Sequence, residues 1–143
     1  YIIYFGIIMR AVNRINTAGQ ASESREQQAL FRWWYVYRSR YPAALLFAVP
    51  NGGARSAITG ARLKAEGVLP GVPDVFLAYP AGGLHGLFIE MKRAGGGRTS
   101  AAQKIVGTLL SHAGYGVAVC HGWQDARDTV MRYMEGRYAE GLE

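Results

Sequence analysis

One hairpin-like segment constrains the fold more than any other part of the chain: residues 71–93, GVPDVFLAYPAGGLHGLFIEMKR. Two apolar runs in it, residues 73–79 and 85–91, have the length of strands, and the glycines between them are typical of a tight turn. The segment is therefore predicted to form an antiparallel hairpin. Its charges need an explanation, because Asp74 and Glu90 belong to strands that otherwise read as buried.

The pairing of this hairpin decides which charged side chains meet. If the strands pair about Gly82, position i faces position 164 − i, and Asp74 lies opposite Glu90. Directly opposed residues project from the same face with Cβ atoms about 4.5–5.5 Å apart. Because side chains alternate along a strand, Lys92 shares the face of Glu90 and Met91 points to the other face. A bulge at the glycine turn would shift this register by one residue.

The three charged residues suggest a chemical task. Two neighbouring carboxylates repel each other, and a divalent cation removes that repulsion. Mg²⁺ commonly binds one or two carboxylates together with waters and phosphate oxygens, and an ammonium group beside it can stabilise charge that develops on phosphorus. Asp74, Glu90 and Lys92 therefore indicate a site that hydrolyses phosphodiesters. A simple salt bridge between Lys92 and one of the carboxylates is the alternative.

The rest of the chain alternates between helix and strand patterns. Ser100 and Gln103 have the spacing of a capping box, which predicts the start of a helix. The predicted elements are helix 22–38, strand 44–49, short helix 57–66, strands 73–79 and 85–91, a helix from residue 100, strand 115–120 and helix 125–134. Two apolar helix faces are expected, one made of Ala29, Leu30, Trp33, Trp34 and Tyr37 and one made of Ile105, Val106, Leu109 and Leu110.

The hairpin motif resembles a known nuclease signature. PD at residues 73–74, followed by EMK at residues 90–92, resembles the PD-(D/E)xK motif. The segments PNGGARS, LKAEGVLPGVPDVFLA, GLFIEMKR, TSAAQ and GYGVAVC resemble the virus-type replication-repair nuclease domain, VRR-NUC, in its stand-alone form from phages and prophages. The resemblance covers residues 22–133. It implies an α/β fold with a restriction-endonuclease-like core, in which helices flank a mixed central sheet.

The resemblance also implies roles for individual residues. Asp74 and Glu90 match the metal-binding acidic pair, and the backbone carbonyl of Met91 would be a further ligand of Mg²⁺ or Mn²⁺. Lys92 matches the catalytic lysine. Gln103 matches a glutamine that supports the site, although the capping box explains the same residue equally well.

The family also supplies an acidic residue from the first helix. Glu23 fits best by its spacing to the apolar face of that helix, and Glu26 lies on a nearby face. Either carboxylate could instead balance the dipole at the N-terminus of the helix. Both residues therefore remain candidates for the catalytic set.

DNA is the expected partner. The formal charge of +6 favours a polyanion. The residues predicted to contact DNA are Asn51, Gly52, Gly53, Arg55, Arg62, Lys64, Arg93, Arg98 and Lys104. No base-reading motif is recognised, so the substrate is expected to be chosen by its shape. The resemblance implies a homodimeric, metal-dependent endonuclease for branched DNA such as four-way (Holliday) junctions, in the cytoplasm of a bacterial or phage-infected cell. A flap or single-strand-specific nuclease and a non-catalytic DNA-binding module are the alternatives.

The 143 residues, half of them hydrophobic, suit one domain with one core. Residues 21–136 are predicted to form the nuclease domain, with an N-terminal extension at 1–20 and a C-terminal tail at 137–143. The apolar run at residues 1–9 is too short to span a bilayer, which takes about 20 residues, so no membrane partner is expected. Residues 1–8 are interpreted as upstream readthrough or a variable extension, with an edge strand or a subunit contact as the alternative. The single cysteine excludes an intramolecular disulfide and a cysteine-rich zinc site.

Overall fold

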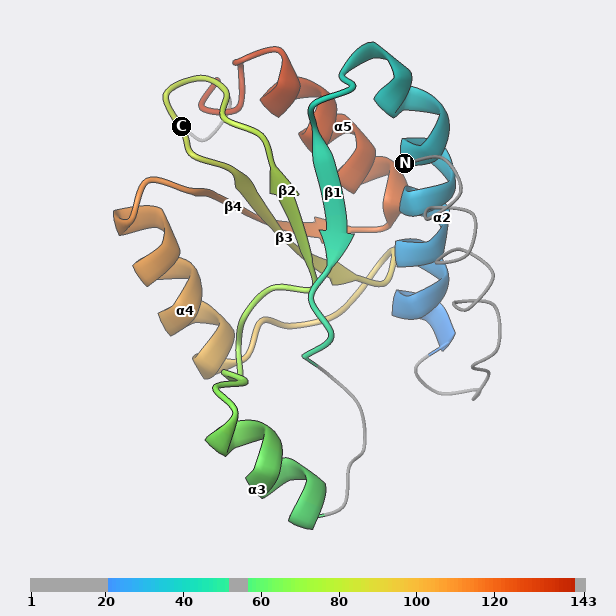
Figure 1. Ribbon diagram of the computed structural model, residues 1–143. Coiled ribbons are helices and arrows are strands. Elements are labelled where there is room, and N and C mark those ends of the chain that lie inside the picture. The colour runs from blue at the N-terminus through green and yellow to red at the C-terminus, as the bar shows by residue number, and fades with distance from the viewer. Residues whose placement is uncertain (1–20, 52–56, 141–143) are drawn as a thin grey trace.

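The computed structural model describes residues 21–51 and 57–140 of the chain. Its centre is a four-stranded sheet with strand order β1-β2-β3-β4 (Figure 1). The strands are β1 (Leu45–Ala48), β2 (Val75–Ala78), β3 (Leu87–Lys92) and β4 (Gly116–His121). The first three are antiparallel neighbours, whereas β4 runs parallel to β3. The predicted α/β fold with a mixed central sheet is thus confirmed.

Helices cover both faces of this sheet. The helices of the described residues are α2 (Ala21–Tyr37), which continues into a short 3-10 turn at Arg38–Arg40, α3 (Ala57–Ala65), α4 (Ala101–His112) and α5 (Trp123–Met134), and all of them except α3 pack on the sheet. α2 and α5 pack on each other and on one face, while α4 lies against β4 on the other (Figure 1). The boundaries differ from prediction by a few residues: α5 begins earlier, β2 is shorter, and β3 extends through Lys92.

The hydrophobic core lies between the sheet and the α2–α5 pair. Leu30 and Trp34 of α2 and Val130 and Tyr133 of α5 are almost completely buried there. They pack with the alternate sheet residues Leu46, Val75, Leu77, Leu87, Ile89, Met91 and Cys120. The odd-numbered positions of β2 and β3 therefore form the apolar face of the sheet, and the even-numbered positions project from the opposite face.

The β2–β3 hairpin has the predicted register. Val75 pairs with Ile89, and Leu77 pairs with Leu87, so position i faces position 164 − i. At the turn, Ala81 pairs instead with Leu84 through two backbone hydrogen bonds of 2.9 and 3.1 Å. Between the Leu77–Leu87 pair and the Ala81–Leu84 pair, one side of the hairpin has three residues (78–80) and the other side has two (85 and 86). The extra residue is a bulge next to the turn, and it does not change the register from Leu77–Leu87 onward.

The apolar face predicted for α4 is only partly correct. Val106 is buried, whereas Ile105 is 63% exposed and Leu109 is 61% exposed. α4 meets the sheet along one line, and Gly107 lies over Val117 of β4. Positions about 100° away from this line point to solvent.

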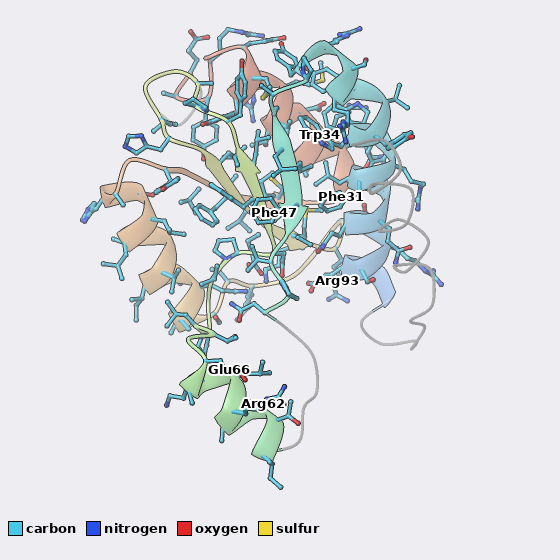
Figure 2. The ribbon with its side chains drawn as sticks, in the orientation of Figure 1. Phe31, Trp34, Phe47, Arg62, Glu66 and Arg93 are labelled. Atoms are coloured by element: carbon cyan, nitrogen blue, oxygen red, sulfur yellow. The ribbon has the colours of Figure 1, made fainter. Side chains whose placement is uncertain are left out.

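α3 extends away from the sheet (Figure 1), and its Ile58 is 84% exposed. Arg62 and Glu66 form an exposed ion pair of 3.4 Å along the helix, and both residues are labelled in Figure 2. Among the helices of the described ranges, none has the length and apolarity needed to cross a membrane.

The loop that leads into β2 is held from two sides. Asn51, just after β1, donates its side-chain amide to the carbonyl oxygens of Leu69 at 2.6 Å and Val72 at 3.2 Å. Gly71 has a φ of +91°, and a Cβ added there would lie 2.6 Å from the backbone carbonyl group of Ala102. The first turn of α4 therefore packs directly on the backbone of this loop, which leaves no room for a side chain.

A matched pair of glycine variants tests this packing. Gly67→Ala imposes an unfavourable φ of +93° with no atom within 4 Å of the new Cβ, so a loss of about 1 kcal/mol is expected. Gly71→Ala adds a clash with α4, so a further loss of about 1–3 kcal/mol is expected. Urea unfolding measures both free energies. Equal losses in the two variants would show that the loop and α4 do not pack as described.

Candidate active site

Asp74, Glu90 and Lys92 meet at the end of the hairpin. Asp74 immediately precedes β2, and the register that pairs Val75 with Ile89 places it opposite Glu90 on the even-numbered face. Glu90 is only 5% exposed and Lys92 only 6% exposed, although both side chains carry charge. The structure therefore brings the three predicted residues together in a largely buried site.

The side chain of Asp74 continues the hydrogen bonding between β2 and β3 just before β2 begins. Its Oδ2 accepts a hydrogen bond of 2.9 Å from the backbone N–H of Met91. In a strand the N–H and C=O of one residue point to the same edge, so the carbonyl of Met91 also points toward the Asp74 side of β3. The family resemblance implies that this carbonyl is a metal ligand.

The two oxygens of Glu90 have different surroundings. Oε1 accepts hydrogen bonds from Lys92 Nζ, at 2.8 Å, and from Gln103 Nε2. Oε2 is buried and has no hydrogen-bond partner. Leaving a buried carboxylate oxygen without a partner costs free energy. The salt bridge with Lys92 that was the alternative interpretation is thus present, but it satisfies only one of the two oxygens.

Gln103 uses both ends of its side-chain amide. Its Oε1 accepts from the backbone N–H of Ser100 at 2.8 Å, and its own backbone N–H donates to Ser100 Oγ at 3.2 Å. This is the predicted capping box of α4, and it is confirmed. Nε2 of the same amide reaches Glu90. Helix capping and support of the site are therefore compatible roles for Gln103.

Burial raises the pKa of both the Asp74 and the Glu90 carboxyl groups above their ordinary values. The negative charge of Asp74 raises the pKa of Glu90 further, and that of Glu23 raises both. The charge of Lys92 acts in the opposite direction on the pKa of each carboxyl group. Three carboxylates thus face one ammonium group, an arrangement that a bound cation would stabilise.

The structure separates the two glutamates of α2. Glu23 lies exposed in the first turn of the helix, where its charge reaches Asp74 and Glu90. Glu26 instead accepts a hydrogen bond of 2.8 Å on its Oε2 from the backbone N–H of Trp123, the first residue of α5. The N-cap of α5 is Gly122, which has no side chain to accept that bond. Glu26 therefore caps α5 and joins it to α2.

The donors at this site suit a hard cation. Within residues 21–51 and 57–140, no three Asp, Glu, His or Cys side chains form a ready-made metal site. The oxygens of Asp74, Glu90 and the Met91 carbonyl are the donors that Mg²⁺ and Mn²⁺ prefer, with water and substrate oxygens completing the coordination. The unpartnered Oε2 of Glu90 is the observation that fits such an ion.

The predicted DNA contacts lie on several elements. Arg62 and Lys64 are exposed on α3, Arg93 and Arg98 are exposed after β3, and Lys104 is exposed on α4; Figure 2 labels Arg62 and Arg93. Asn51 holds the loop before β2 through its amide. Gly52, Gly53 and Arg55 lie outside the described residues.

Sequence patterns did not single out His121. Its spacing to the other histidines indicates no metal site, but β4 places it beside Lys92 in parallel pairing. This neighbour is visible only once the β3–β4 pairing is known.

Comparison with known proteins identifies the family. The family model of the VRR-NUC domain matches residues 21–124, which include the hairpin, α4 and β4. A solved structure described as a VRR_NUC domain protein has a similar fold, with a TM-score of 0.65 and 23% sequence identity over 80% of this chain and 89% of that chain. No curated protein matches the chain in sequence. The chain belongs to the VRR-NUC domain family.

Proposed function

We propose that this chain is a Mg²⁺- or Mn²⁺-dependent DNA endonuclease with a PD-(D/E)xK active site. Its family implies a nuclease-type function acting on DNA. The observation that carries the proposal to this particular site is Glu90 Oε2, which is buried beside a second carboxylate and lacks a partner. In a purely structural ion pair, the second carboxylate oxygen would be expected to have a hydrogen-bond partner as well, because an unpaired buried oxygen costs free energy.

Asp74, Glu90 and the carbonyl of Met91 would hold the cation. When bound, it would neutralise charge on the phosphate and acidify a water. The residues around it supply orientation. The N–H of Met91 fixes Asp74, and Gln103 fixes Glu90 from the rigid start of α4.

Lys92 supplies the positive charge. Its Nζ is held 2.8 Å from Glu90 Oε1, so the ammonium group lies next to the proposed cation site. There it would stabilise the negative charge that grows on the phosphate oxygens in the transition state. The carboxylate of Glu23 would add to the negative potential that attracts the cation.

We further propose that the substrate is branched DNA, including four-way junctions, and that the active form is a homodimer. Both proposals rest on the resemblance to stand-alone phage and prophage domains, as does a cytoplasmic location. Two sites related by a two-fold axis would suit a junction with matching symmetry. The exposed basic residues on α3, after β3 and on α4 support contacts with phosphates, which carry no sequence information.

Removing the charged groups one at a time tests the catalytic assignment. Asp74→Asn, Glu90→Gln and Lys92→Met are each expected to slow cleavage by at least about 100-fold, because the first two weaken binding of the cation and the third removes the positive charge beside the phosphate. Asp128→Asn is the matched control, since Asp128 is an exposed carboxylate on α5 paired with Arg127. Single-turnover cleavage with circular dichroism as a folding check would measure this. Wild-type rates in the three site variants would overturn the assignment.

The raised pKa of Asp74 predicts an effect on stability with a definite sign. A carboxyl group whose pKa is higher in the folded state favours folding at low pH and opposes it as the pH rises through that pKa. In chelator at pH 7.5, Asp74→Asn is therefore expected to raise Tm, because the amide oxygen can still accept from Met91 without a buried charge. At pH 4 the difference should shrink.

Metal addition provides the second half of this test. Mg²⁺ or Mn²⁺ is expected to raise the Tm of the wild type, because a ligand that binds the folded state stabilises it. The metal is expected to have little effect on the Tm of Asp74→Asn, because this variant lacks one of the proposed ligands. Differential scanning calorimetry of both proteins at both pH values, with and without metal, measures the effect of metal on the Tm in each case. An equal response of both proteins to metal would contradict the proposed ligand.

A cleavage panel tests the substrate. Four-way junction, flap, splayed arm and linear duplex are compared at fixed salt in Mg²⁺ and in Mn²⁺, with chelator as the control. The junction is expected to be cut fastest and the chelator sample not at all. Faster cutting of flaps or single strands would favour the alternative nuclease class, and binding without cleavage in either metal would favour a DNA-binding module.

A further inference from the structure

His121 lies beside the proposed catalytic lysine on the neighbouring strand. It ends β4 and pairs with Lys92 in the parallel register, so the two side chains project from the same face. The backbone around it is fixed on both sides. The N–H of His121 donates to Asp125 Oδ2 at 2.8 Å, and the N–H of Gly122 donates to the carbonyl of Lys92 at 2.9 Å.

The imidazole holds the loop that follows β3. His121 Nδ1 lies 3.2 Å from the carbonyl oxygen of Gly96, which belongs to the segment between β3 and α4, residues 93–100. A carbonyl oxygen only accepts, so Nδ1 carries the proton in this contact. The middle of the β3–α4 loop is thereby tied to the end of β4.

The next residue of this loop packs on Lys92. A Cβ added to Gly97 would lie 3.0 Å from Cδ, 3.2 Å from Cβ and 3.3 Å from Cγ of Lys92. The backbone of Gly97 therefore lies against the aliphatic part of the lysine, with a φ of +105°. This packing helps to explain why a long, charged side chain is only 6% exposed.

We propose that His121 and Gly97 are positioning residues for Lys92. His121 holds Gly96, and the adjoining backbone of Gly97 presses on the lysine carbons and keeps Nζ at Glu90 Oε1. A lysine has a flexible four-carbon stem, and holding it in place before substrate binds favours catalysis through preorganisation. The effect on cleavage rests on the proposed nuclease function, whereas the packing of the loop on Lys92 does not.

Two glycines of the loop separate this contact from backbone strain. Gly95 has a φ of +79° and no atom within 4 Å of an added Cβ, so Gly95→Ala imposes a strained φ without touching Lys92. Gly97→Ala is expected to lower kcat at least tenfold relative to Gly95→Ala, with KM changed less than twofold. Equal kcat values in the two variants would overturn the role of Gly97.

The role of His121 is tested by conservative replacement. His121→Ala removes the hydrogen bond to Gly96 and is expected to lower kcat about as much as Gly97→Ala. The side-chain amide of His121→Asn can donate in place of Nδ1 and should restore kcat to within about threefold of wild type. His112→Ala, at an exposed position in the last turn of α4, is the control. Equal losses in His121→Ala and His121→Asn would overturn the role of the hydrogen bond.

A measurement independent of activity completes the test. The ¹H–¹³C signals of the Lys92 side chain, assigned by their loss in Lys92→Met, are expected to shift in Gly97→Ala and His121→Ala but not in Gly95→Ala or His112→Ala. Unchanged signals in the first two variants would overturn the positioning proposal even if the wild type cuts DNA. A wild type that does not cut DNA, but shows the expected shifts, would contradict the nuclease proposal alone.

Discussion

Glu90 places a negative charge inside the protein, and the end of the hairpin is organised around it. A buried charge is tolerated only when several groups compensate for its lost hydration. Here one group is local and the other is not: Lys92 lies on the same strand as Glu90, and Gln103 comes from α4. Both bind the same oxygen, so the second oxygen remains without a partner. This unequal satisfaction distinguishes the site from an ordinary buried ion pair and supports the proposed cation.

The start of α4 serves the fold and the site together. The capping box with Ser100 fixes the side chain of Gln103, while Gly71 packs under the same turn. Asn51 in turn holds the loop that contains Gly71. The geometry around Glu90 therefore depends on contacts that also stabilise the domain, and a helix and a central strand hold it more rigidly than loops would.

The two faces of the sheet contribute differently to stability. The face under α2 and α5 is apolar, and residues such as Leu30, Trp34 and Val130 are almost fully buried there. The other face carries two carboxyl groups whose pKa is raised by burial, so their ionised forms oppose folding at neutral pH. The hydrophobic core offsets this cost, as is common where a functional site is less stable than the scaffold around it.

The sequence by itself determined the hairpin register and the helix cap. Alternation along two strands and a short glycine turn were enough to place Asp74 opposite Glu90, and the S-x-x-Q spacing was enough to start α4 at Ser100, because both depend on residues close in the chain. Only the tertiary structure decided the rest. In the folded protein Glu26 caps the N-terminus of α5, whereas the charge of Glu23 acts on the carboxyl groups of Asp74 and Glu90. It also set His121 beside Lys92. Local patterns specify the face on which a side chain lies, but the packing of distant elements decides what that face meets.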